Sequence, residues 1–342
     1  MRKPVIVLMS AAAALAASVF VVGALPADAC LHPPREFKIP IKADAQKGLI
    51  FFADGRQEMV IRPGYKLDTE GMKGADDAIA GFTTVAWLIP TPNLPDNYKE
   101  VDAKVFAQLE EFTKAYDNSP EDSKHDDTNT WRGKRGGAGA KGAEFHEEVV
   151  VGDYKIQPIK AHGELGVQEL KGWLKDNGFG EPKDDLVRWY TDKEYYWLAV
   201  KLHNPKGLPA NGEIKPLQIG FKTDKPVYPV RIHEGAGAFD LELWLITRKE
   251  VDTDKSKAFG LRTVEQRDPM MAQANRETTF ANLPKEISKV SADAEALKQM
   301  KEGKLYCYRF FAPGINDKID LSKWDGDLSF EFKPAADAKP VD

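Results

Sequence analysis

The fold class of this chain is decided by residues 49–62, Leu49-Ile50-Phe51-Phe52-Ala53-Asp54-Gly55-Arg56-Gln57-Glu58-Met59-Val60-Ile61-Arg62. An apolar run, an Asp-Gly pair and a second run of β-prone residues predict two strands joined by a tight turn. A similar pattern recurs at 149–156, where Gly152-Asp153 separates two apolar runs. Hairpins of this kind are typical of antiparallel sheets.

Strands outnumber helices along the rest of the chain. Apolar residues recurring every three or four positions predict helices at 101–116, 167–178 and 284–302. Short turns, and not crossover helices, link most of the strands. The chain is therefore predicted to be α+β, with mainly antiparallel β-sheets and about three packed helices in one large or two-lobed domain. Further strands are expected at 39–41, 82–89, 195–202, 217–222, 227–232, 241–247, 305–311 and 328–332.

Residues 1–29 have the features of a secretory signal peptide. Arg2 and Lys3 precede a long apolar run, and Ala27-Asp28-Ala29 forms the cleavage site. An apolar run of about 20 residues can also span a bilayer, but residues 11–17 are mostly small and no basic cluster follows Cys30. The protein is therefore expected in the periplasm or outside the cell, with no transmembrane segment after signal cleavage.

The remaining chain is predicted to form one domain over residues 30–333. Within it, residues 117–143 are rich in Asp, Gly and Lys and poor in apolar residues, which predicts a mobile insertion. The polar residues 334–342 are predicted to form a disordered tail.

The two cysteines, Cys30 and Cys307, lie at opposite ends of the exported chain. In an oxidising compartment this even count predicts a disulfide bond between them. Two alternatives remain open: Cys30 could carry a lipid anchor, although Asp28 fits a lipoprotein signal badly, or both thiols could be free.

The composition excludes several classes of function. The net charge is −5, with both signs interspersed, so a nucleic-acid-binding surface is not expected. The six histidines form no metal-binding spacing, so no metal site is predicted. Residues 137–142 match G-x-G-x-x-G but follow a charged stretch and precede a strand, so they predict a flexible linker and no cofactor.

Catalytic candidates are few. His233, Glu234 and Asp240 follow a predicted strand and could act as acid, base or ligand. The simpler interpretation is that they make ordinary hydrogen bonds at a strand end. No G-x-S-x-G nucleophile motif is present, which weakens a hydrolase interpretation.

Two proline-framed segments are candidates for binding. Trp87 precedes Pro90 and Pro92, and Tyr228 lies between Pro226 and Pro229. Each aromatic residue either packs in the core at a strand end or forms a rigid lip for a ligand.

These segments also carry a resemblance to a known family. In order along the chain they are 50–55, 86–92 (Ala-Trp-Leu-Ile-Pro-Thr-Pro), 170–174 with 177–179, and 216–217 leading to 226–229. Together they resemble the bacterial secreted proteins grouped as DUF2330, a family of unknown function. The resemblance implies export and a single domain, and it supplies no activity or site residues.

Two functions follow as hypotheses. The first is a non-enzymatic domain that binds a ligand or envelope component. The alternative is an extracytoplasmic, hydrolase-like enzyme whose residues meet only in the folded chain.

Overall fold

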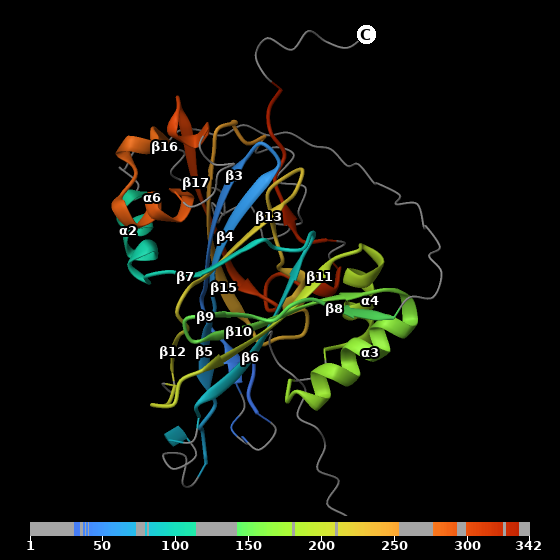
Figure 1. Ribbon diagram of the computed structural model, residues 1–342. Helices are drawn as coiled ribbons and strands as arrows, with labels where there is room; N and C mark the ends of the chain where they lie inside the picture. Colours follow the sequence, from blue (N-terminus) through green and yellow to red (C-terminus); the bar gives the residue numbers. More distant parts are fainter. Residues whose placement is uncertain are drawn as a thin grey trace, which may run out of the picture.

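The computed structural model describes residues 31–34, 37, 39, 41–72, 79–80, 82–113, 142–179, 182–208, 211–252, 276–292, 299–323 and 326–334. This part of the chain is an α+β domain built mostly from antiparallel sheets (Figure 1), which confirms the predicted fold class. The signal peptide, Cys30, nearly all of the insertion 117–143 and nearly all of the tail 334–342 lie outside the described residues.

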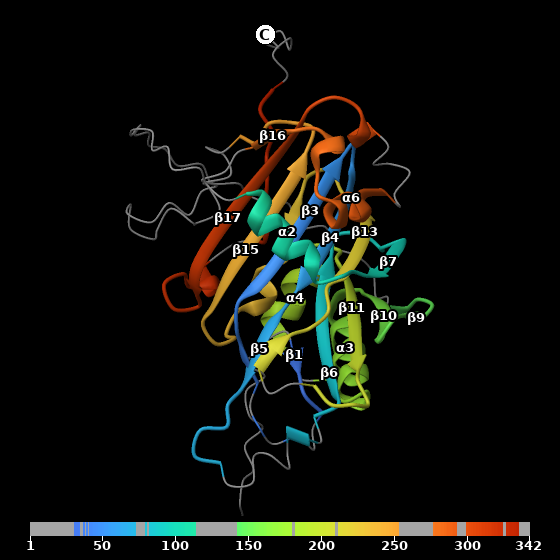
Figure 2. The same cartoon turned by 90° about the vertical axis from the view of Figure 1, so that its left-hand side faces the viewer.

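A large sheet runs through the centre of the molecule. Its long strands lie side by side in both views (Figures 1 and 2). Neighbouring strands are antiparallel, except that β3 and β15 are parallel. In spatial order the strands are β16 (Arg276–Thr278), β17 (Leu305–Ile315), β15 (Phe239–Thr247), β3 (Gln46–Ala53), β4 (Arg56–Arg62), β13 (Leu217–Lys222) and β7 (Asn97–Glu100).

The predicted hairpin at 49–62 is confirmed as β3 and β4. Asp54 and Gly55 have φ angles of 45° and 80°. Positive φ at both central residues is the geometry whose twist matches that of the paired strands. The buried apolar residues form two clusters, which we call the first core and the second core. Successive side chains on β3 enter different clusters: Ile50 lies in the first core and Phe51 in the second core. The hairpin is therefore buried on both faces.

A second sheet packs against the first core. The predicted hairpin at 149–156 is confirmed within it as β9 and β10. Its strands are β1 (Leu31–His32), β6 (Thr84–Thr91), β11 (Tyr196–His203), β10 (Tyr154–Ala161) and β8 (Ala143–Phe145) in spatial order, with β9 (Val149–Val151) also pairing with β10. Two small sheets complete the set: β12 (Asn211–Glu213), β5 (Gly64–Leu67) and β2 (Ile41–Ala43) in one, β14 (Val227–Tyr228) and β18 (Leu328–Ser329) in the other.

Helices cover both sheets. Helices α2 (Lys104–Phe112) and α6 (Lys285–Ala292) cover the second core on the large sheet, and α3 (Gly163–Asp176) and α4 (Asp184–Asp192) lie against the second sheet (Figure 1). The helices predicted at 101–116 and 167–178 are confirmed as α2 and α3. The helix predicted at 284–302 is confirmed over α6, and residues 293–298 lie outside the described residues. None of the described helices is long and apolar enough to cross a membrane.

The structure adds one helix to the predicted elements and shortens one predicted strand. Helix α4 was not predicted, and the adjacent Asp184 and Asp185 lie in its first turn. The strand predicted at 227–232 ends at Tyr228, and a 3₁₀ helix, η1 (Arg231–His233), follows Pro229. Strand β6 runs one residue past Pro90 to Thr91; the proline was expected to end the strand or to lie at an edge, and the second is the case. β1 borders β6 only at Ala86 and Trp87, so the open edge beside Pro90 needs no N–H donor.

Candidate functional site

The carboxyl group of Asp327 is buried where α4, η1 and the β14–β18 pair meet. Pairing of Tyr228 with Leu328 brings Asp327 beside η1, and the buried face of α4 brings Tyr190 to the same place. Oδ1 of Asp327 accepts hydrogen bonds from the Tyr190 hydroxyl at 2.7 Å and from the Arg231 backbone N–H at 3.0 Å. No described residue donates a hydrogen bond to the buried Oδ2.

We define the Asp327 cluster as Asp327 and the polar and aromatic side chains around it. Its members are Trp189, Tyr190, Lys193, Tyr195, Arg231 and Asp327.

Burial dominates the electrostatics of this cluster. It raises the pKa of Asp327 to about 7, against the opposing effects of the Tyr190 and Arg231 hydrogen bonds and of the nearby Lys193 charge. The same burial, together with the Asp327 charge, raises the pKa of Tyr190 well above its usual value. The cluster can therefore hold or release a proton near neutral pH, a property common at functional sites.

Two cations lie over the half-buried ring of Trp189. The Arg231 guanidinium carbon is 4.9 Å and the Lys193 Nζ 4.5 Å from the ring centroid. Arg231 also pairs with Glu234, with Nη2 3.4 Å from Oε2. These contacts fix positive charge close to the Asp327 carboxyl, where stacking on an aromatic ring favours a cation.

The sequence candidates His233 and Glu234 lie on the turn that carries Arg231. His233 is buried, and the Gln46 amide donates a hydrogen bond to its Nδ1 at 3.2 Å. Burial lowers the pKa of His233 to about 3, so the imidazole is neutral. The Asn316 side chain donates to the His233 carbonyl at 2.7 Å. These contacts hold the turn in place, and a catalytic role for His233 or Glu234 stays a prediction.

Asp240 is separate from the Asp327 cluster. It is exposed at the start of β15, and its Oδ1 accepts a hydrogen bond from the Gly314 backbone N–H at 2.8 Å. This bond fixes the irregular end of the β15–β17 pair, where the register shifts. Among the described residues, no three His, Cys, Asp or Glu side chains are grouped so that they could hold a metal ion.

The proline-framed aromatic residues are core residues. Trp87 is 3% exposed and Tyr228 is 1% exposed, so neither ring forms a lip at the surface. Pro90 is also buried, opposite Trp197, whose ring lies 5.3 Å from that of Tyr190. Pro92 is half-buried just beyond β6. Ligand contact by any of these residues stays a prediction.

Sequence reasoning missed Asp327 and its partners. A usable signal was the density of aromatic and basic residues at 188–197, Arg-Trp-Tyr-Thr-Asp-Lys-Glu-Tyr-Tyr-Trp. Asp327 itself lies in an ordinary Asp-Gly-Asp turn sequence, and nothing near it in the chain indicates that its carboxyl is buried.

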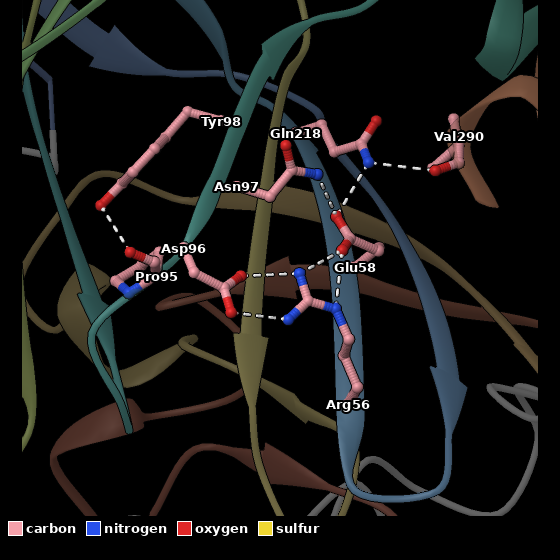
Figure 3. A network of polar contacts seen from close by, with 8 residues as sticks. All are labelled: Arg56, Glu58, Pro95, Asp96, Asn97, Tyr98, Gln218 and Val290. Atoms are coloured by element: carbon pink, nitrogen blue, oxygen red, sulfur yellow. Dashed lines mark hydrogen bonds and ion pairs between the residues drawn. The ribbon is translucent and has the colours of Figure 1, made fainter. Parts of the chain in front are cut away.

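A second buried carboxyl, Glu58, shows the contrasting arrangement (Figure 3). Its Oε1 accepts from Arg56 at 2.8 Å, and its Oε2 accepts from Asn97 at 3.0 Å and Gln218 at 2.8 Å. Arg56 also pairs with Asp96, and Gln218 reaches the Val290 carbonyl on α6 at 3.0 Å. Both oxygens of the Glu58 carboxylate therefore have hydrogen-bond donors. The network also joins β4, β7, β13 and α6.

The predicted disulfide stays a prediction, because Cys30 lies outside the described residues. Cys307 is buried in the second core, opposite Ile246 of β15. Leu31, the neighbour of Cys30 in sequence, pairs with Trp87 in the second sheet and packs in the first core.

The fold and the site define an α+β protein with two large and two small sheets and a buried carboxyl group whose pKa is raised to about 7. The chain belongs to the family described as "Uncharacterized protein conserved in bacteria (DUF2330)", which matches residues 67–331 and confirms the resemblance seen in the sequence. No curated protein matches the chain.

Solved structures of baculovirus P35 show a distant similarity. The crystal structure of baculovirus P35 is 13% identical, with a TM-score of 0.31, covering 71% of this chain and 75% of that one. The crystal structure of the caspase-8/P35 complex gives 10% identity and a TM-score of 0.32, covering 85% and 90%. Scores at this level do not establish a common fold.

Proposed function

We propose that this protein is an exported bacterial domain that binds a ligand or envelope partner and catalyses no reaction. Export rests on the charged start, apolar run and cleavage site of residues 1–29. Membership in a family of uncharacterised bacterial proteins is compatible with it and assigns no activity.

The observation that carries the binding function is the exposure of three large apolar side chains on β8, β9 and α3; the other large apolar residues exposed in the described part of the chain, Met72, Leu94 and Phe311, lie outside these elements. Phe145 is 46% exposed on β8, Val150 69% on β9 and Leu165 51% on α3. Strands β8 and β9 both pair with β10, and α3 packs against β8 and β10, so the three elements that carry these residues are neighbours. Exposed apolar groups concentrated in one region are typical of interaction surfaces.

The sequence-derived catalytic candidates support the same conclusion. His233 is held by Gln46, Glu234 by Arg231 and Asp240 by Gly314. Each side chain therefore has a structural contact that accounts for its position.

An extracytoplasmic enzyme is the second candidate, and Asp327 is the observation that favours it. A carboxyl group with a pKa near 7 and one oxygen without a donor suits general acid–base catalysis. The two candidate functions differ in whether the protein turns over a substrate with Asp327 as its acid–base group.

A panel of chromogenic esters, phosphate esters, glycosides and peptide anilides separates them. We expect no turnover above that of the Asp327→Asn variant. Turnover that is lost in Asp327→Asn, kept in the exposed control Asp317→Asn, and titrates near pH 7 would establish the enzyme and overturn the binding proposal.

Export is tested on the full chain in a Gram-negative expression host. The mature protein is expected in the periplasm with Cys30 at its N-terminus by intact mass, while a chain lacking residues 1–29 stays in the cytoplasm. A diacylglycerol adduct on Cys30 would select the lipoprotein alternative, and an intact Met1 on soluble periplasmic protein would contradict cleavage.

A further inference from the structure

We propose that the protein binds an extended, basic peptide segment of its partner by strand addition to the β8–β9 edge of the second sheet. This inference rests on the proposed binding function and names its surface and the chemistry of its partner. Added strands gain affinity from main-chain hydrogen bonds and specificity from alternate side chains.

The backbone of this edge faces outward at Ala143, Phe145 and Val150. The N–H of Ala143 points away from β10, toward Glu169, and the N–H of His146 points inward, to the Pro158 carbonyl at 3.0 Å. Because successive residues of a strand alternate, Phe145 directs its N–H and C=O outward. The same alternation in the β9–β10 hairpin, which closes on the pair Val151 and Tyr154, turns Val150 outward.

The backbones of Phe145 and Val150 have no hydrogen-bond partner among the described residues. The ends of the edge are closed by carboxylates: Glu169 accepts from the Ala143 N–H at 2.6 Å, and Glu100 accepts from the Asp153 N–H at 3.3 Å. Among the described residues, no strand pairs with the outward side of the stretch between Phe145 and Val150, and β7 lies close to β9 at its Val151 end. An unpaired strand edge of this kind is a template for another strand.

The side chains at the two open positions lie on the same face. Phe145 pairs with Ile159 and Val150 with Lys155, and these partners are four residues apart on β10, about 13 Å along the strand. The ring of Phe145 packs against that of Trp173 on α3, with 5.8 Å between the ring centroids. An added strand would therefore lie beside apolar groups contributed by β8, β9 and α3.

The charges on this edge select a basic partner. Glu144, Glu147 and Glu148 are exposed along it. Glu148 pairs with Lys155 at 2.9 Å and Glu144 lies 3.6 Å from His162, while no described residue pairs with Glu147. The segment is acidic overall, so a peptide that alternates basic and apolar residues matches both its charge and its exposed side chains.

The probe is the peptide acetyl-Lys-Val-Lys-Val-Thr-Val-Lys-Val-Lys-amide, added to the mature protein. Residue-resolved hydrogen exchange is expected to slow at the amides of Phe145 and Val150, which face solvent in the unbound protein. A peptide with alternate N-methylated valines cannot complete the ladder and is expected to give no protection. A peptide with Glu in place of Lys is expected to bind more weakly, and the difference should shrink with added salt.

Val150→Pro is the decisive variant, with Val150→Thr as its matched control. Proline removes an N–H that the β9–β10 ladder does not use, so the fold is expected to stay intact, which the thermal midpoint checks. Affinity should fall about tenfold in Val150→Pro and change little in Val150→Thr, which keeps the donor.

Three results would overturn the proposal: binding unaffected by Val150→Pro, protection at amides elsewhere in the chain, or dimerisation of the protein through this edge on size-exclusion chromatography. None of them bears on whether the protein is an enzyme, which the substrate panel decides separately.

Discussion

The Tyr190 hydroxyl donates a hydrogen bond to Oδ1 of Asp327 across 2.7 Å, and this contact joins α4 to the β14–β18 pair. The Arg231 N–H makes the second bond to the same oxygen. Oδ2 is left buried without a described donor. An ionised carboxylate costs more free energy in such a place than a neutral one, so the proton on Asp327 affects the stability of the fold.

The stability of the protein should therefore fall as pH rises through neutrality. Asp327 has a pKa of about 7 in the folded chain and an ordinary value of 3.8 when unfolded. The folded state then binds the proton more tightly, so this contribution is complete below pH 3.8 and is lost as pH rises to about 7. In Asp327→Asn the pH dependence should flatten by on the order of 3 kcal/mol between pH 5 and pH 8. Urea unfolding at pH 5 and pH 8 measures it.

The exposed Asp317→Asn variant is the control and should keep the pH dependence of the parent protein. A parent protein whose unfolding free energy rises steadily from pH 5 to 8, with the same slope in Asp327→Asn, would show that Asp327 is not protonated in the folded state.

Removing the Tyr190 hydroxyl should act on the same group. Tyr190→Phe deletes a hydrogen bond that lowers the pKa of Asp327, so that pKa should rise further. The variant should lose about 1–2 kcal/mol at pH 8, where the carboxylate needs its donors, and less at pH 5. Equal losses at both values would contradict coupling between the hydroxyl and the charge.

The Glu58 network predicts an asymmetric response to mutation. Arg56→Met leaves the buried Glu58 carboxylate without its cation and should destabilise the protein by about 3 kcal/mol. Asp96→Asn removes an exposed partner of the same arginine and should cost about 0.5 kcal/mol. Adding Glu58→Gln to Arg56→Met should restore part of the loss, because it removes the unpaired charge. Similar losses in the two single variants would refute the ranking.

The ring of Tyr228 packs so closely against Gly48 that there is no room for a side chain at that position. A Cβ atom at Gly48 would lie 2.6 Å from the Tyr228 ring and 2.8 Å from Leu243. Gly48→Ala should cost about 2 kcal/mol, and less in a Tyr228→Leu background, where the ring is absent. A double-mutant cycle by chemical denaturation measures the coupling, and additive effects would argue against this contact.

Cys307 provides a test of the N-terminal region. Its burial should protect the thiol from iodoacetamide in native protein made without export, with alkylation only in denaturant. In the exported chain, a Cys30–Cys307 disulfide would lower the intact mass by two hydrogen atoms and block alkylation until reduction. Alkylation of Cys307 in denatured, unreduced exported protein would rule the bond out.

Elements specified by neighbours in sequence were predicted well. The Asp54-Gly55 turn fixes the β3–β4 hairpin, because those two residues adopt the positive φ angles it needs. Asn177 and Gly178 end α3 as expected, with Gly178 at a φ of 78°. The short apolar runs on either side of this turn likewise indicated strands, because a run of this length bounded by turn residues is a local property of the sequence.

The tertiary structure alone decided the parallel pairing of β3 with β15 and the surroundings of Asp327. Leu241 meets Gln46, and Asp327 meets Tyr190, across long separations in sequence. The charge state of a carboxyl depends on which groups exclude water from it, and those groups come from α4 and η1. The sequence thus determined the strands, turns and family of this protein, whereas the packing of distant segments determined its buried carboxyl and its open sheet edge.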